Sequence, residues 1–293
     1  MRLGLAGGHL PYDPRRVDAT LAATLRQLGF SGTLVHFGYD SGLGPAEIDR
    51  GACRHARDVL AAHAIRIVHS WGFAPTLVHP DEDVRRAEVA RLRDALALAA
   101  ELGADAVLTG AGSNNPRGGY WPHRENHSAG ARDRLVRSLR EAAQAAEELG
   151  LAIALECHVT TTLDSPERVR EILESVGSPA VRVNLDPVNF VGDLPTLWDS
   201  GPLVDRVFAA LGEFAVSGHV KDVVPEDDLV VHLSEALVGE GEFDLRRYLT
   251  RFERELPDAW LFVEHLPENL VPRAKSTLDG LLAELGIRPR EAA

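Results

Sequence analysis

The sequence has few cysteines and no excess of basic charge. Its only cysteines, Cys53 and Cys157, do not form a CxxC pair, which argues against a disulfide framework or a structural zinc knuckle. Acidic residues number 44 against 31 basic ones, giving a formal net charge of −13. Because a nucleic-acid-binding surface needs a basic footprint, this balance argues against nucleic acid as a partner and favours a small molecule.

Long apolar runs are also missing. No segment has the uncharged length of a membrane-spanning helix, and the opening residues MRLGLAGGHLPYDP lack the apolar core of a signal peptide. We therefore expect a soluble, cytoplasmic protein that does not contact a membrane. The sequence leaves open whether identical chains associate into a homo-oligomer.

Short apolar runs alternate along the chain with longer amphipathic segments that close on a Leu-Gly pair. Glycine just past a helix adopts the left-handed cap conformation without steric cost, so each pair predicts a helix end with a strand after it. Two of these helices carry an apolar face that should pack on a sheet. The pairs are Leu28-Gly29, Leu102-Gly103 and Leu149-Gly150, and the two faces are Val89, Leu92, Leu96 and Ala99, and Leu135, Leu139, Ala142 and Ala146.

Eight strand-like segments, each followed by a helical stretch, predict a closed (β/α)8 TIM barrel that occupies residues 1–293 as a single domain. An open doubly wound sheet is the alternative, but no GxGxxG motif follows the first strand, and no composition break divides the chain. The expected strands are residues 3–7, 33–37, 65–70, 105–109, 151–156, 181–186, 214–220 and 260–264.

Four of the later strands end in polar residues. Loops at the carboxyl ends of barrel strands build the active site, so polar residues there indicate chemistry. Strand residues alternate between two faces, which groups Glu156 with the small Ala152 and Ala154 on the expected inner face. The other strand ends are Asp186, grouped with Asn184 and Arg182, His219, grouped with Ser217 and Ala215, and Glu264.

Three carboxylates and an imidazole at one barrel mouth would repel one another and shift their proton affinities, unless a cation lets them stay ionised together. A divalent metal ion is the simplest resolution. The donor set of Glu156, Asp186, His219 and Glu264 is rich in oxygen. It suits Mn2+, the ion we expect, or Mg2+ or Co2+, and differs from the nitrogen and sulfur shells of structural zinc.

The strand ends LECH, NLDPVN, GHVKD and VEH, with VGEGEFD after the third, resemble the xylose-isomerase-like family of sugar phosphate isomerases and epimerases. The resemblance covers nearly the whole chain. It implies that Glu156, Asp186, His219 and Glu264 bind one divalent metal ion, and that Glu156 and Glu264 also serve as the acid and base pair. Several ketose 3-epimerases of the family have a histidine where this chain has Asn189, which argues against 3-epimerase activity.

Further residues near the strand ends are candidates for substrate binding. Lys221 shares a face with His219 and could bind substrate oxygens or pair with Asp222 or another acid. The long glycine-rich segment 110–128 is typical of a lid, and its Tyr120 and Trp121 could close over a substrate. The remaining candidates are His158 and Asn189, just beyond two metal ligands, and His69, which we rank above His36.

The predicted reaction is proton transfer at a carbon next to a carbonyl through an enediolate, on a small carbohydrate or related polyol. Isomerisation, epimerisation and dehydration of a keto-sugar or keto-cyclitol share this first step. A glycosidase would also use two carboxylates, but it needs no metal ligands such as Asp186 and His219. An endonuclease-IV-like hydrolase with three zinc ions would need more histidine ligands, and a metal-binding scaffold without activity would carry the same four residues.

Overall fold

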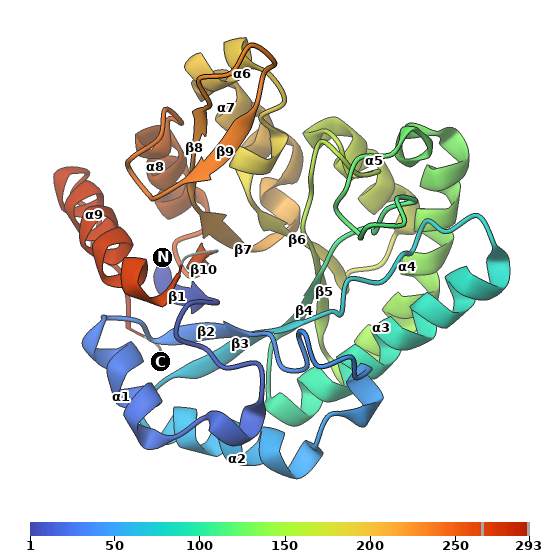
Figure 1. The fold of residues 1–293 in the computed structure, drawn as a ribbon, viewed down its shortest axis with the longest axis horizontal. Coiled ribbons are helices and arrows are strands. Elements are labelled where there is room, and N and C mark those ends of the chain that lie inside the picture. Colours follow the sequence, from blue (N-terminus) through green and yellow to red (C-terminus); the bar gives the residue numbers. More distant parts are fainter. Residues whose placement is uncertain (265–266, 292–293) are drawn as a thin grey trace.

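A computed structural model of the chain describes residues 1–264 and 267–291. Eight parallel strands close into a barrel in the order β1-β10-β7-β6-β5-β4-β3-β2, and Figure 1 shows helices in a ring outside the strands. The predicted TIM barrel is confirmed. Its strands are β1 (Arg2–Ala6), β2 (Gly32–Val35), β3 (Arg66–Trp71), β4 (Ala106–Thr109), β5 (Ala152–Leu155), β6 (Val181–Leu185), β7 (Ala215–Val220) and β10 (Trp260–Glu264).

The helices connect successive strands and cover the outside of the barrel. The Leu-Gly pairs mark helix ends as predicted, and Gly29, Gly103 and Gly150 have φ angles of 83°, 64° and 67°. Both predicted apolar faces, on α3 and α4, are buried. The helices are α1 (Ala19–Gln27), α2 (Arg50–Ala62), α3 (Glu82–Leu102), α4 (Ala129–Leu149), α5 (Pro166–Val176), α6 (Leu194–Trp198), α7 (Gly201–Leu211), α8 (Leu245–Glu255) and α9 (Val271–Glu284).

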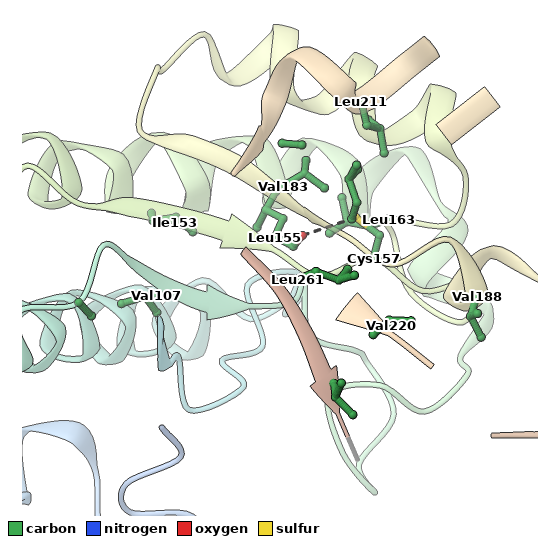
Figure 2. Close-up of a cluster of buried hydrophobic side chains, with 14 of the residues drawn as sticks. Val107, Ile153, Leu155, Cys157, Leu163, Val183, Val188, Leu211, Val220 and Leu261 are labelled. Carbon is green, nitrogen blue, oxygen red and sulfur yellow. Dashed lines mark hydrogen bonds between the residues drawn. The ribbon is translucent and has the colours of Figure 1, made fainter. Parts of the chain in front are cut away.

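Apolar side chains between strands and helices form the larger part of the core. Figure 2 shows Ile153, Leu155 and Val183, from adjacent strands, in one buried cluster with Cys157 and Leu163. Burial raises the pKa of the Cys157 thiol well above its usual range, and this cysteine packs as a small apolar residue, in line with the absence of any CxxC pair.

The barrel interior holds a second, smaller apolar cluster that contains Ala154 but also the large rings of Trp260 and Phe262. These rings fit because glycines face them. A Cβ atom at Gly4 would lie 2.5 Å from the Phe262 ring, and one at Gly32 would lie 2.3 Å from the Trp260 ring. Phe262 packs against the rings of His69 and His219 and so forms the floor beneath the strand ends.

One predicted grouping of strand residues is wrong. The register of β6 and β7 shifts, so that Val183 pairs with Ala215 while its neighbour Asn184 pairs with Ser217. The extra residue in β7 is a bulge, which interrupts the alternation of side chains. Ala215 therefore belongs to the outer core, whereas Ser217 remains on the inner face with His219 and donates a 2.6 Å hydrogen bond to Asn184.

The segment after β7 forms an antiparallel hairpin that is not among the strands expected from the sequence. Strands β8 (Asp222–Pro225) and β9 (Leu233–Ala236) pair with each other and stand apart from the barrel sheet (Figure 1). In the part of the chain that the structure describes, no helix is both long and apolar enough to cross a membrane.

Candidate active site

Four neighbouring strands bring the predicted polar residues to one end of the barrel. Glu156 directly follows β5 and Asp186 directly follows β6, while His219 lies near the end of β7 and Glu264 is the last residue of β10. These strands are consecutive in the barrel, so their carboxyl ends meet at one mouth. One donor atom from each residue lies within 4.8 Å of the other three. His265, the last residue of the VEH motif, lies outside the described residues.

The His219 ring lies among the three carboxylates. Its Nδ1 is 2.7 Å from Glu264 Oε2, 3.3 Å from Glu156 Oε1 and 3.9 Å from Asp186 Oδ2. All four residues are buried. Within the described residues, no hydrogen bond with suitable geometry reaches Glu156 Oε1, either carboxylate oxygen of Asp186 or either ring nitrogen of His219. Buried polar atoms normally have partners, and a group of this composition could hold a metal ion.

Burial and mutual charge shift the proton affinities of the cluster. Burial raises the pKa of Asp186 to about 7, with Lys221 acting against the shift. Burial alone would lower the pKa of His219, but the carboxylates of Glu264 and Glu156 outweigh it and raise that pKa to about 10. Burial alone would raise the pKa of Glu156, but the adjacent His219 holds it at about 2. The cluster therefore depends on positive charge among its carboxylates.

Lys221 supplies a second positive charge. Its Nζ lies 2.7 Å from Glu264 Oε1, 3.0 Å from Asp186 Oδ2 and 3.0 Å from Glu235 Oε1 on β9. The sequence left open whether Lys221 pairs with Asp222 or another acid, and the partners are these other acids. Asp222 instead accepts hydrogen bonds from the backbone amides of Val223, Gly239 and Phe243.

The segment 110–128 reaches the site through Tyr120. The Tyr120 hydroxyl donates a 3.1 Å hydrogen bond to Glu156 Oε2, and its ring lies 5.0 Å from the ring of His158. The segment is held in place by the fully buried Asn126, which donates to the backbone oxygen of Thr160. Trp121 lies elsewhere: it is half exposed and stacks against the guanidinium of Arg117.

A cavity of about 390 Å³ is lined by three of the four residues, Glu156, His219 and Glu264, but not by Asp186. Of the predicted substrate-binding residues, His158 lines it, whereas Asn189, Lys221, His69 and Trp121 are not part of its lining. Asn189 is buried in the turn Pro187–Phe190 that follows Asp186. The lining consists of Ala6, Leu34, His36, Tyr39, Trp71, Ala74, Leu108, Tyr120, Glu156, His158, His219 and Glu264.

Of the two histidines that the sequence ranks, the lower-ranked His36 lines the cavity, whereas the higher-ranked His69 does not. His69 pairs with Ala106, the first residue of β4, and so lies deeper in the barrel than the strand ends. There its ring packs 5.2 Å from the ring of Phe262, and burial lowers its pKa to about 3. His69 is therefore a neutral core residue under the site.

Sequence reasoning missed three residues of this region, Tyr39, Trp71 and Glu235. Trp71 ends β3, and Tyr39 lies in the loop after β2, so the rule that strand ends build the site could have found both. Glu235 gave no such signal, because the hairpin that carries it was not predicted.

The family model for the xylose isomerase-like TIM barrel matches residues 22–283 of this chain. The chain belongs to this family. No curated protein matches the chain.

Solved structures give the same assignment of fold for this xylose isomerase-like protein. It is similar to a D-tagatose 3-epimerase-like protein, with 17% identity, 98% of each chain covered and a TM-score of 0.73. A D-psicose 3-epimerase in the presence of D-fructose is 16% identical, with 98% of this chain and 100% of that chain covered and a TM-score of 0.70. A xylose isomerase-like TIM barrel protein from Mycobacterium smegmatis in complex with magnesium is 17% identical, with 97% and 96% covered and a TM-score of 0.69. At such identities the matches show a shared fold.

Proposed function

We propose that this protein is a divalent-metal-dependent isomerase or epimerase of a small carbohydrate. The observation that carries the proposal is the buried group of Glu156, Asp186, His219 and Glu264, whose donor atoms lie within 4.8 Å of one another. The membership of the family supports it, as do the similar structures of a D-tagatose 3-epimerase-like protein, a D-psicose 3-epimerase and a protein in complex with magnesium.

The four residues fit a divalent ion. Several of their buried atoms lack a hydrogen-bonding partner among the described residues, and three carboxylates with one imidazole form the oxygen-rich set that Mn2+, Mg2+ and Co2+ accept. We therefore propose these four as the ligands of one ion, with Mn2+ as the first candidate. A divalent ion polarises a carbonyl and stabilises negative charge on the adjacent oxygen.

The proton transfer itself is assigned to Glu156 and Glu264. They come from β5 and β10, which are separated in the barrel by β6 and β7, so the two carboxylates reach the cavity from different strands. One removes the proton from the carbon next to the carbonyl, and the other returns a proton to the enediolate. The Tyr120 hydroxyl fixes the orientation of Glu156 by its hydrogen bond, and His158 lies where it can bind a sugar hydroxyl.

The test is exchange of carbon-bound hydrogen with solvent. The protein is freed of metal, reloaded with Mn2+, Mg2+ or Co2+, and incubated in D2O with a panel of ketoses and aldoses. We expect deuterium next to the carbonyl of at least one sugar, and no exchange with a chelator present. The product then separates isomerisation and epimerisation from dehydration, which begins with the same proton removal. A folded protein that binds no divalent ion would overturn the proposal.

A further inference from the structure

A second cavity of about 380 Å³ lies beside the first, between the loops that follow β1 and β2. Tyr39 lines both cavities. Each volume falls within the range of about 300–1,000 Å³ typical of small-ligand pockets. Because both loops leave the carboxyl ends of their strands, the second cavity opens on the same barrel end as the candidate active site.

Aromatic rings connect the two cavities. The ring of Trp71, in the first cavity, lies 5.3 Å from that of Tyr39, which lies 4.8 Å from that of Tyr12 in the second cavity. Tyr12 and Tyr39 are 46% and 41% exposed. Neighbouring exposed aromatic side chains at a cavity are typical of a ligand-binding surface.

The backbone holds this aromatic row in place. The amide of Gly38 donates a 2.9 Å hydrogen bond to the carbonyl of Tyr12, which ties the two loops together. Four non-glycine residues within the described ranges have positive φ angles, and three of them, Asp40, Phe73 and Ala74, lie in the loops after β2 and β3. Such conformations persist where the surroundings enforce them, and they cluster at functional sites.

The walls of the second cavity combine apolar rings with carboxylates. Asp13, Asp40, Glu47 and Asp49 outnumber the two arginines, Arg15 and Arg16, and Arg15 is already paired with Asp13. This balance disfavours a phosphate or another anion. A sugar ring matches both kinds of wall, because its C–H face packs on aromatic rings and its hydroxyls donate to carboxylates.

We propose that the second cavity binds a further sugar ring of the substrate, so that the protein acts on a disaccharide or glycoside whose reacting ring occupies the candidate active site. This inference rests on the proposed function. In this arrangement the aromatic ring of Tyr12 packs against the further sugar ring, and Tyr39 lies where the two sugar rings are joined.

Binding of keto-disaccharides tests the inference directly. Lactulose, turanose and isomaltulose join a second ring to fructose at three different positions, and their affinities for the Mn2+-loaded protein are compared with that of D-fructose by calorimetry. We expect at least one of them to bind about tenfold more tightly than fructose, which corresponds to about 1.4 kcal/mol. Tyr12→Ala should bring this ratio close to one. Trp198→Ala is the matched control, because Trp198 is an exposed aromatic residue that lines neither cavity.

Two results would overturn the inference: none of the three disaccharides binds more tightly than fructose, or a folded Tyr12→Ala variant keeps the preference. Melting temperatures establish folding, and Tyr12→Leu serves if the alanine variant is unstable, since leucine also lacks the flat ring. Failure of the proposed function looks different. In that case the disaccharide preference and its loss in Tyr12→Ala remain, but no sugar exchanges hydrogen with solvent in the presence of any metal.

Discussion

The Nζ atom of Lys221 lies 3.0 Å from Oε1 of Glu235, and this contact connects the residue directly after barrel strand β7 to hairpin strand β9. The same ammonium group also contacts Asp186 and Glu264. Lys221 therefore has two effects: it fixes the hairpin at the mouth of the barrel, and it balances carboxylates that we propose as metal ligands.

Lys221→Met should destabilise the metal-free protein more than the metal-loaded protein. Removing one partner of a buried ion pair costs about 3–5 kcal/mol, because the remaining charges are left uncompensated. A divalent ion restores positive charge at the same place. We expect the increase in melting temperature on addition of Mn2+ to be larger for Lys221→Met than for the parent, as measured by calorimetry with chelator and with metal.

The chain offers a matched control, because Lys275 is its only other lysine. Lys275 pairs with Asp279 on α9, at 2.7 Å. Lys275→Met should leave the effect of Mn2+ on the melting temperature unchanged. An equal response to Mn2+ in Lys221→Met and the parent would contradict the assignment of Lys221 as a charge that the metal replaces.

His219→Ala should remove most of the bound metal. The imidazole lies among all three carboxylates, and its loss removes one of four proposed ligands. Outer partners of metal ligands alone are worth about 10–100-fold in affinity, so we expect a loss of roughly a hundredfold or more. Metal content by mass spectrometry should fall from near one ion per chain. His127→Ala, on an exposed pair with Asp164, is the control.

Glu156→Gln and Glu264→Gln should each abolish solvent hydrogen exchange. Glutamine keeps the size of the side chain but cannot accept the proton, and loss of a general acid or base typically costs about 10²–10⁴-fold in rate. Because both residues are also proposed ligands, the variants are assayed with excess Mn2+ and measured metal content.

Glu147→Gln on α4 is the control for both glutamate variants. Its carboxylate accepts a hydrogen bond from Ser178 at the surface and is not part of the candidate active site. Hydrogen exchange between substrate and solvent should therefore be unchanged. If a metal-loaded Glu156→Gln or Glu264→Gln variant exchanged hydrogen at the parent rate, that glutamate would have no part in proton transfer.

The sequence predicted the barrel and the position of the four polar residues because both depend on local patterns. Strand length, alternation and the helix ends at Gly103 and Gly150 are set by neighbouring residues, and parallel strands then bring their carboxyl ends together. The contact of Tyr120 with Glu156 could be suggested by loop length, but not located, since the path of the loop depends on distant partners of Asn126.

Other features depend on register and could not be predicted locally. The bulge that moves Ala215 to the outer core arises from the pairing of β7 with β6. The depth of His69 in the barrel likewise follows from its pairing with β4, so the sequence ranks His69 above His36 although only His36 lines the cavity. The contact of Lys221 with Glu235 needs a hairpin that the apolar pattern did not indicate.

A buried arginine on the outside of the barrel makes a separate prediction about stability. Arg85 is 1% exposed and donates hydrogen bonds to Glu82, Ser138 and Glu141, which joins α3 to α4. Arg85→Ala should lower the free energy of unfolding by about 2–3 kcal/mol, since the two carboxylates that lose their partner are partly exposed. The neighbouring Arg86 is 66% exposed and also pairs with Glu82, so Arg86→Ala should change stability by less than about 0.5 kcal/mol. Equal effects in urea titrations would contradict this assignment.

The last prediction concerns His69 and pH. Burial lowers the pKa of His69 to about 3 in the folded protein, against 6.5 for an ordinary histidine. Between these values the unfolded chain binds one more proton at this position than the folded chain, so stability falls as the pH falls below 6.5. The loss amounts to about 1.4 kcal/mol per pH unit, or about 2 kcal/mol by pH 5. Above pH 6.5 the histidine is neutral in both states and contributes no pH dependence.

His69→Phe isolates this effect, because phenylalanine keeps a ring against Phe262 and cannot titrate. The free energy of unfolding is measured with chelator for the parent and the variant between pH 5 and pH 8, so that metal binding does not contribute. All other titrating groups are common to both proteins, and their contributions cancel in the difference. We expect the variant to gain about 2 kcal/mol over the parent on going from pH 7.5 to pH 5. A difference that stays constant over this range would mean that His69 accepts a proton in the folded barrel, and that it has access to solvent or to a carboxylate of the site.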